Sequence, residues 1–454
     1  MKDITIGYIG GGSRGWAWTL MADLALEPEL RGTVKLYGLN YDASKTNEAI
    51  GNSLLDRSDC PGKWRYRAVR EIGEALEGAD IVVASIFPGS MRDMEVDVHA
   101  PEEYGIWQSV GDTTGPGGIF RALRAVPMYA EIAHAVRAYC PDAWVVNYTN
   151  PMAACVSALY EVYPGIKAIG CCHEVFSAQR LLAAALADRR GIRGVPWEDI
   201  AVNPLGVNHF TWFDRAYYRD MDLLPLFAEF ADAYFESGFE GNDADHRLNA
   251  FFACGERVKF DLFRRYGLIA AAGDRHLAEF IRPGYLKDPA TARSWKFDLT
   301  PVSWRMAHGA GLAEKVQRLA DGRERFEPSR SGEVGVRLIK ALAGGGEIVS
   351  NVNLPNRGQI EGLPLGAVVE TNAYFAADQV RPIAAGRLPP DVEALVVRHA
   401  YAQRALVRAA LEKNRRLAFS VFAEDPLVTI DRDAARSLFD RMMAAQATYF
   451  TDWK

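Results

Sequence analysis

The chain has 454 residues, of which 49% are hydrophobic and 24% are charged, and its formal net charge is −6. This composition can build sizeable cores and excludes collagen, low-complexity disorder and a disulfide scaffold. Because Lys and Arg are not in surplus, we expect no nucleic-acid partner. The N-terminus has no signal-peptide pattern and no apolar run approaches a membrane span, so we expect a cytoplasmic protein without a membrane partner.

Strand-like and helix-like segments alternate through the first half of the chain. The expected strands are Ile4–Ile9, Val34–Leu39, Ile81–Ile86, Val145–Tyr148 and Ala168–Gly170. The expected helices between them are Trp16–Leu26, Ser44–Ser53 and Ile119–Tyr139. This alternation predicts βαβ units, and therefore an α/β fold whose N-terminal domain, residues 1–200, is a Rossmann-like, doubly wound parallel sheet.

The pattern becomes mainly helical after about residue 200. The expected helices there are Leu223–Phe239, Leu248–Arg265, Val392–Glu412 and Ala434–Thr448. Strand signals are sparse, although an antiparallel sheet is compatible with the pattern. We therefore predict that residues 201–454 form a second, mainly helical α+β domain that binds substrate and metal and mediates oligomerisation.

A glycine-rich loop directly follows the first expected strand and opens the first expected helix. It satisfies the pattern G-x-G-x-x-G with Gly10, Gly11, Gly12, Ser13, Arg14 and Gly15. Glycines allow close approach of a pyrophosphate, and a helix N-terminus offers it free N–H groups, so the loop predicts bound NAD. Asn40 lies where an acidic residue usually binds the ribose, so the preference for NAD over NADP has weaker support.

Two segments that contain histidine follow short expected strands. Cys172 lies in Gly170–Val175 and His209 lies in Gly206–Phe210, a spacing of 209 − 172 = 37 residues. A thiolate and an imidazole suit a borderline divalent metal. The spacing matches no short metal motif, and from spacing alone a buried cysteine with a hydrogen-bonded histidine is the commoner explanation, so both interpretations stay open.

Three further polar segments have two interpretations each. Asn150 ends a strand and precedes a proline, which suits either a ligand contact or a turn. The glycine-rich residues Gly111–Gly118 form either a substrate loop or a mobile connector. Gly273–His276 places three ionisable side chains in an apolar setting, where a solvated turn is the alternative to a functional site.

Six segments of the chain together carry a resemblance to a known family. They are Ile9–Ser13, Gly111–Arg124, Asn147–Met152, Gly170–Val175, Gly206–Trp212 and Asn351–Gly358. In this order they resemble glycoside hydrolase family 4, whose members depart from hydrolysis by two carboxylates. The resemblance implies NAD and a divalent metal, usually Mn²⁺, as cofactors, with Cys172 and His209 as metal ligands.

The residues that follow the metal cysteine imply the substrate. Relatives with Asp or Asn after this cysteine act on phosphorylated sugars, whereas relatives with Cys-His act on free hexosides or uronides. The sequence Cys172-His173-Glu174-Val175 most resembles the α-galacturonidase branch. The resemblance therefore implies an α-galacturonide, with α-glucosidase, α-galactosidase and α-glucuronidase activities as alternatives. An NAD-dependent dehydrogenase of the malate or lactate type is the alternative of another class.

The reaction of the family is a redox-assisted elimination. NAD takes a hydride from C3 of the sugar, a base removes the C2 proton, the aglycone leaves C1, water adds, and the hydride returns. The resemblance implies Asp274 as the base, with Tyr266 as the runner-up. It also implies that His173 donates a proton to the leaving group or orients the sugar, and that Asn150 touches both substrate and nicotinamide.

A uronate carboxylate favours a bidentate arginine. Arg121 and Arg275 are the nearest candidates in the sequence, and the sequence does not choose between them. Glu174 is expected to position that arginine or to bind a sugar hydroxyl, and His276 is expected to contact substrate. Because family members form dimers or tetramers, we also expect a homodimer or homotetramer.

Overall fold

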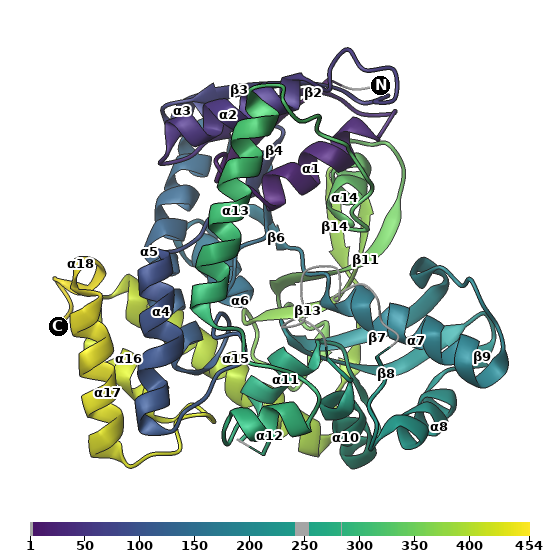
Figure 1. The fold of residues 1–454 in the computed structure, drawn as a ribbon, viewed down its shortest axis with the longest axis vertical. Coiled ribbons are helices and arrows are strands. Elements are labelled where there is room, and N and C mark those ends of the chain that lie inside the picture. The colour runs from purple at the N-terminus through teal and green to yellow at the C-terminus, as the bar shows by residue number, and fades with distance from the viewer. Residues whose placement is uncertain (1–2, 241–253, 283) are drawn as a thin grey trace.

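One large sheet organises the computed structural model, which describes residues 3–240, 254–282 and 284–454 (Figure 1). Its first six strands are parallel and lie in the order β3-β2-β1-β4-β5-β6. They are β1 (Asp3–Ile9), β2 (Arg31–Tyr37), β3 (Lys63–Val69), β4 (Ile81–Ala84), β5 (Trp144–Asn147) and β6 (Lys167–Gly170). This order is that of a doubly wound dinucleotide-binding sheet, so the predicted Rossmann-like fold of the first half is confirmed, while the domain boundary at residue 200 stays a prediction.

The strand β3 is missing from the elements expected from the sequence. It lies at the edge of the sheet and alternates exposed cationic residues with the buried side chains of Trp64, Tyr66 and Ala68. An edge strand of this kind has no continuous apolar run, and a short alternating segment is easily overlooked.

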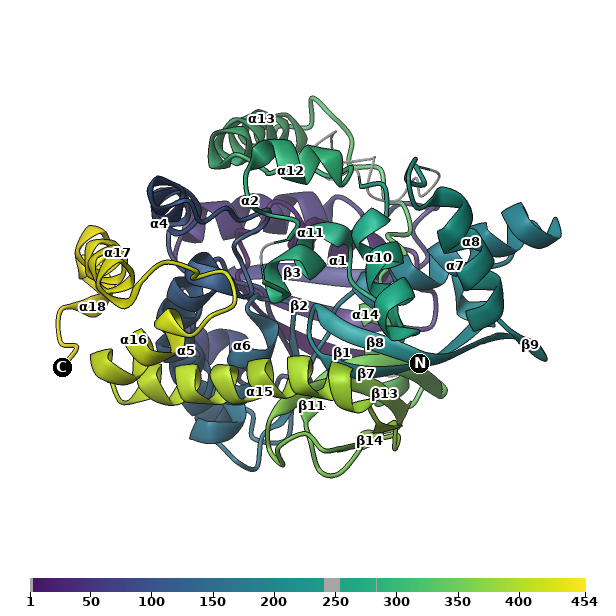
Figure 2. The ribbon, with the colours of Figure 1, turned by 90° about the horizontal axis from the view of Figure 1, so that it is seen from below.

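Helices of the first half cover both faces of this parallel sheet (Figure 2). They are α1 (Trp16–Ala25), α2 (Tyr41–Asn52), α3 (Ile72–Leu76), α4 (Met91–His99), α5 (Gly115–Tyr139), α6 (Met152–Val162) and α7 (Glu174–Arg190), with a 3-10 turn at Ala100–Tyr104. The three helices expected in this half therefore exist, and α5 continues through Pro127.

The sheet continues past β6 with antiparallel strands from the second half of the chain. In spatial order they are β11 (Ile348–Pro355), β13 (Val368–Ala376), β7 (Ile200–Val207), β8 (Phe210–Tyr218) and β10 (Ile269–Ala270). Shorter strands are β9 (Met221–Asp222), β14 (Gln379–Pro382), β12 (Ile360–Glu361) and β15 (Gly386–Arg387). The expectation of sparse strands was wrong, because buried polar residues such as Asn351, Asn353 and Glu370 interrupt the apolar pattern.

The second half also supplies many helices. They are α8 (Leu224–Tyr234), α10 (Arg257–Tyr266), α11 (Asp274–Phe280), α12 (Pro289–Ser294), α13 (Val302–Ala320), α14 (Gly335–Leu342), α15 (Pro390–Leu411), α16 (Arg415–Ala423), α17 (Arg432–Ala445) and α18 (Ala447–Phe450), with a 3-10 turn at Trp197–Asp199. The expected helix Leu248–Arg265 begins outside the described residues, and its described part starts at Arg257. None of the described helices is long and apolar enough to cross a membrane.

The side chains of the parallel strands point into two separate cores. Along β4, Val82 and Ala84 belong to one apolar cluster, whereas Ile81 and Val83 belong to the other. In the first cluster, Phe120 of α5 packs against aromatic rings of α16, α17 and α18. Because both faces are covered, a binding site can form only where strands end, and the carboxyl ends of β1, β4, β5 and β6 share one edge.

Candidate active site

The glycine loop after β1 is tightly packed. Gly10 has a φ angle of 106°, and a Cβ atom on it would lie 1.9 Å from the Ser85 carbonyl oxygen. A Cβ atom on Gly11 or Gly12 would lie 2.8 Å from a neighbouring side chain. The loop leads into the N-terminus of α1 at Trp16. This geometry suits a pyrophosphate, although the binding of NAD to these residues stays a prediction.

Asn40 and Arg14, predicted to contact the cofactor, have contacts within the protein. Asn40 is the N-cap of α2, and its Oδ1 atom accepts a hydrogen bond of 3.0 Å from the Ala43 amide. A guanidinium nitrogen of Arg14 donates to the Gly309 carbonyl of α13 at 3.2 Å. Cap formation explains an asparagine at position 40 without a ribose, so its role in cofactor binding stays a prediction.

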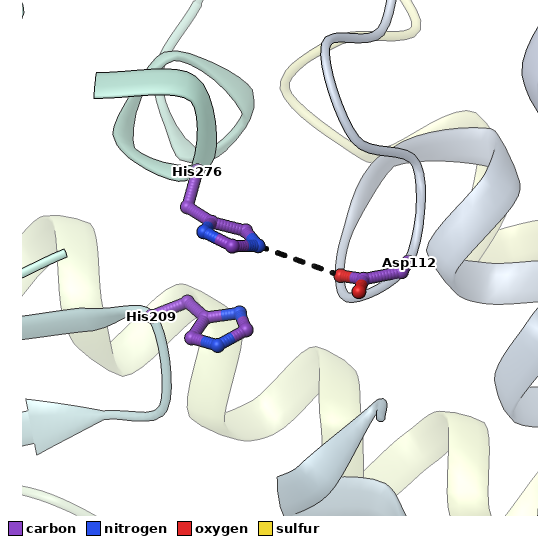
Figure 3. Close-up of side chains that lie close together, drawn as sticks. All are labelled: Asp112, His209 and His276. Carbon is purple, nitrogen blue, oxygen red and sulfur yellow. Dashed lines mark ion pairs between the residues drawn. The ribbon is translucent and has the colours of Figure 1, made fainter. Parts of the chain in front are cut away.

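Three side chains from distant segments meet at the same edge of the sheet (Figure 3). Asp112 lies in the loop before α5, His209 lies in the two-residue turn between β7 and β8, and His276 lies in the first turn of α11. Their donor atoms all lie within 4.8 Å of one another. The ring centroids of His209 and His276 are 3.9 Å apart.

Hydrogen bonds fix the orientation of this cluster. The Thr113 hydroxyl donates to Asp112 Oδ1 at 2.6 Å and lies 2.9 Å from His209 Nδ1. Because its one proton goes to the carboxylate, the hydroxyl accepts from Nδ1–H of His209, which leaves Nε2 with a free lone pair. Asn150 donates its Nδ2 proton to Asp112 Oδ2 at 3.1 Å, so the cluster includes the residue predicted to touch substrate and nicotinamide.

The loop that carries Asp112 is held by α11. Glu279 is fully buried, and its Oε1 atom accepts hydrogen bonds from the amides of Val110 at 2.7 Å and Gly111 at 3.0 Å. Burial raises the pKa of Glu279 to about 7. Neither Asp112 nor Glu279 was predicted as a site residue. The sequence signal that could have identified Asp112 is its place in the glycine-rich loop. The signal that could have identified Glu279 is its position three residues after His276.

The electrostatics of the two histidines differ sharply. Burial lowers the pKa of His209 to about 3, helped by repulsion from His276, so its imidazole is neutral and can bind a metal. Burial also opposes charge on His276, but the carboxylates of Asp112 and Glu174 outweigh it and raise the pKa to about 10. The carboxylates of the cluster therefore favour a positive charge at its centre, and a divalent cation bound there would be stabilised in the same way.

The cluster has donor atoms that fit a divalent metal, and it shares His209 with the predicted pair. Two imidazoles and one carboxylate suit Mn²⁺ or another borderline cation. Among the described residues, the donor atoms that gather around His209 come from Asp112 and His276, and the Cys172 sulfur is not one of them. Cys172 is buried at the end of β6, where burial raises the pKa of its thiol well above the usual value. The role of Cys172 as a ligand therefore stays a prediction.

His173 and Glu174 begin α7 beside the cluster. Glu174 Oε2 accepts a hydrogen bond of 2.7 Å from the Gly273 amide, and its Oε1 lies 3.2 Å from His276 Nδ1. Glu174 thus pairs with a histidine in this structure, and its expected role toward an arginine or a sugar hydroxyl stays a prediction. The ring of His173 is partly exposed, with Nδ1 3.4 Å from Glu333 Oε1. The role of His173 as a proton donor stays a prediction.

Asp274, the predicted base, is completely buried at the start of α11. Its two oxygens accept hydrogen bonds from the amides of Val258 and Lys259, at 3.0 and 3.1 Å, in the first turn of α10. These contacts are those of a helix cap. Burial, with repulsion from Glu256, raises its pKa to about 7. Tyr266, the alternative base, lies at the end of α10, and its ring meets the edge of Trp212 at 5.8 Å.

The two arginines predicted to bind a uronate have different surroundings. Arg121 Nε donates to the Asn150 carbonyl at 3.0 Å, and its guanidinium lies 4.7 Å from the ring centroid of Phe87. Arg275 donates through Nη2 to the Ser109 carbonyl at 2.7 Å and to the Thr300 hydroxyl. Arg275 therefore ties the loop before Asp112 to the segment before α13, whereas Arg121 lies directly beside Asn150.

Comparisons with known proteins give a consistent result. A model of the family 4 glycosyl hydrolases matches residues 5–188, and a model of the C-terminal domain of that family matches residues 205–428. An α-galacturonidase of Thermoanaerobacterium saccharolyticum is 56% identical over 100% of this chain and 98% of its own length. An α-galacturonidase of Bacillus subtilis is 53% identical over 98% of this chain and 97% of its own length.

Solved structures agree with these relatives. The crystal structure of the lplD protein of Bacillus subtilis has a TM-score of 0.93 and 52% identity, and covers 97% of this chain and 100% of its own. A 6-phospho-α-glucosidase from gut microorganisms, in complex with NAD and Mn²⁺, has a TM-score of 0.81. It is 22% identical and covers 99% of each chain, which establishes a shared fold.

Proposed function

Because this chain belongs to the family 4 glycosyl hydrolases, we propose that it is an α-galacturonidase, which hydrolyses α-galacturonides with the help of NAD and Mn²⁺. The observation that carries the proposal is identity of 49–56% to four α-galacturonidases, over 98–100% of the chain. Its identity to an α-galactosidase of Bacillus subtilis is much lower, at 28%. Family membership also excludes the malate or lactate dehydrogenase alternative.

The residues proposed to hold the cofactors lie along one edge of the sheet. Gly10–Arg14 would hold the pyrophosphate of NAD, and His209 and Cys172 would bind the metal, with Asp112 and His276 facing it. When bound, NAD supplies reversible hydride transfer at C3 of the sugar and the metal stabilises charge on the C2 and C3 oxygens. Asn150, which donates to Asp112, would orient the sugar between the two groups.

We assign the proton transfers to two residues of this chain. His173 is partly exposed and faces Glu333, so it would donate a proton to the glycosidic oxygen as the C1–O bond breaks. Asp274 would take the C2 proton, because a pKa of about 7 suits a general base near neutral pH. To do so, its carboxylate must leave the two amides that it caps in this structure.

The substrate assignment is tested with p-nitrophenyl α-glycosides of galacturonate, glucuronate, galactose and glucose, each with NAD and Mn²⁺. The expected result is a clear preference for the galacturonide with no accumulation of NADH, because the hydride returns to the product. A preference for galactoside or glucoside would overturn the substrate but not the family. Incorporation of solvent deuterium at C2 of the product would support the elimination step.

The assignment of the base is tested with Asp274→Asn and Tyr266→Phe. If Asp274 is the base, Asp274→Asn abolishes exchange of the C2 proton while the protein stays folded, and Tyr266→Phe retains exchange. The reverse pattern would transfer the role to Tyr266.

We also propose that the protein is a cytoplasmic homodimer or homotetramer. Cell fractionation would check the location, and light scattering would check the oligomeric state.

A further inference from the structure

The helix α13 brings a third arginine, Arg305, toward the candidate active site. We propose that Arg305 and Arg121 bind the C6 carboxylate of the sugar, so that α13 contributes the preference for a uronide over a neutral hexoside. This inference rests on the proposed α-galacturonidase function and names the residues that would recognise its substrate. Figure 1 shows α13 running beside α2 and α4. The Gly309 carbonyl of α13 also accepts a hydrogen bond from Arg14 of the glycine loop.

The start of α13 is fastened to the segments that carry the cluster. The buried Thr300 donates its amide to the Ser109 carbonyl at 3.4 Å and accepts a hydrogen bond from Arg275, the neighbour of His276. The Val302 amide donates to His99 Nε2 at 3.3 Å. The first turn of α13 therefore has a fixed position relative to the loop before Asp112.

Arg305 lies on the inward face of α13. Residues three and four apart share one face of a helix, and Arg305 lies between Val302, which is fully buried, and Gly309, whose carbonyl accepts from Arg14 of the glycine loop. This face therefore runs from the Asp112 loop toward the proposed cofactor loop. Arg305 is one turn from the end nearest the cluster.

The charges around Arg305 belong to the active site. Burial lowers the pKa of its guanidinium, whereas the carboxylates of Asp112 and Glu279 raise it and the nearby Arg121 lowers it further. Burial, with repulsion from Arg305, lowers the pKa of Arg275 to about 10. Three guanidinium groups thus share a partly buried space with two carboxylates, one of which, Glu279, has a pKa raised to about 7. A carboxylate placed between Arg121 and Arg305 would be stabilised by both guanidinium groups.

The three arginines are not equivalent. Arg275 uses its guanidinium to hold Ser109 and Thr300, which makes it a positioning residue. Arg121 uses only Nε, and its terminal nitrogens have no hydrogen-bond acceptor among the described residues. Because Arg121 holds Asn150, which in turn donates to Asp112, a carboxylate on Arg121 would lie beside a sugar bound at the cluster. Arg305 belongs to α13, whereas Arg121 belongs to α5, so the two guanidinium groups come from different helices.

The test compares Arg305→Gln, Arg305→Lys and a control on the same helix, Arg318→Gln, whose side chain is exposed and pairs with Glu324. For Arg305→Gln, kcat/KM on p-nitrophenyl α-galacturonide should fall by about 30-fold or more, mainly through KM. Turnover of the matched α-galactoside should change less than about threefold, because it has no carboxylate. Arg305→Lys should recover part of the loss, and Arg318→Gln should behave like wild type.

The outcomes of this test distinguish a failure of the inference about Arg305 from a failure of the proposed function. If wild type prefers the galacturonide and Arg305→Gln keeps that preference, the role of Arg305 fails and the function stands. If wild type prefers a neutral hexoside, the proposed function fails first. Inhibition of wild type by free galacturonate, galactose and galactose 6-phosphate tests the pocket without any variant. Tighter binding of galacturonate than of the other two supports a carboxylate site, and tightest binding of the phosphate overturns it.

Discussion

The glycine loop and the metal cluster occupy the same edge of the sheet but are built in different ways. The loop consists of six consecutive residues, Gly10–Gly15, between one strand and one helix. The cluster joins Asp112, His209 and His276, which are separated by 209 − 112 = 97 and 276 − 209 = 67 residues. A site made of neighbours depends on local backbone geometry, whereas an assembled site depends on every contact that aligns its segments.

The largest effect is expected at the assembled site. His209→Ala should lower kcat by on the order of 1,000-fold, because metal stabilisation of charge contributes several kcal/mol. Binding of NAD, followed by fluorescence titration, should be nearly unchanged, since the glycine loop is separate. His134→Ala, at an exposed position of α5, is the control and should retain full turnover. Full activity in His209→Ala would remove His209 from the site.

A substitution in the glycine loop should mainly change the stability of the fold. Gly10→Ala should destabilise the fold by about 3 kcal/mol, because alanine is strained at a φ angle of 106° and its Cβ would meet the Ser85 carbonyl. Thermal unfolding would measure the loss. Gly15→Ala is the matched control, since a Cβ atom there meets nothing within 4 Å. Equal stability of the two variants would contradict the tight packing of the loop.

The ligands of the metal can be separated from one another. Asp112→Asn should weaken Mn²⁺ binding by roughly 10- to 100-fold, as measured by the metal concentration that restores activity after EDTA treatment. Cobalt-loaded wild type should show a sulfur-to-cobalt absorption band that Cys172→Ser abolishes. If wild type shows no such band, Cys172 is not a ligand, and Asp112, His209 and His276 are the ligand set.

The smallest effect concerns a contact that holds the Asp112 loop from the far end of the chain. Asp425 accepts hydrogen bonds from the Thr114 hydroxyl and the Gly115 amide, and burial raises its pKa to about 6. The unfolded carboxyl ionises near pH 4, so this group's contribution to stability is full below pH 4 and is lost as the pH rises to about 6. Between pH 4 and pH 6 the free energy of unfolding of wild type should therefore fall by on the order of 1–2 kcal/mol relative to that of Asp425→Asn. Urea unfolding at a series of pH values would measure this difference.

The sequence alone specified the parallel half of the fold and the glycine loop. Buried strands such as Ile81–Ala84 are continuous apolar runs, and the loop pattern G-x-G-x-x-G lies in adjacent positions. It also specified the family, because six motifs occur in order along the chain. The sequence further identified His209 as part of a site. These features need only local patterns, which a sequence shows directly.

Tertiary structure alone decided which groups meet around His209. Asp112 and His276 come together because Glu279 of α11 ties down the Asp112 loop and because the hairpin β7–β8 joins the same sheet. Tertiary structure also gave Asp274 the contacts of a helix cap and placed Arg305 near Asp112. The physical reason is that these contacts depend on how strands and helices pack across long separations, and no local periodicity records that packing.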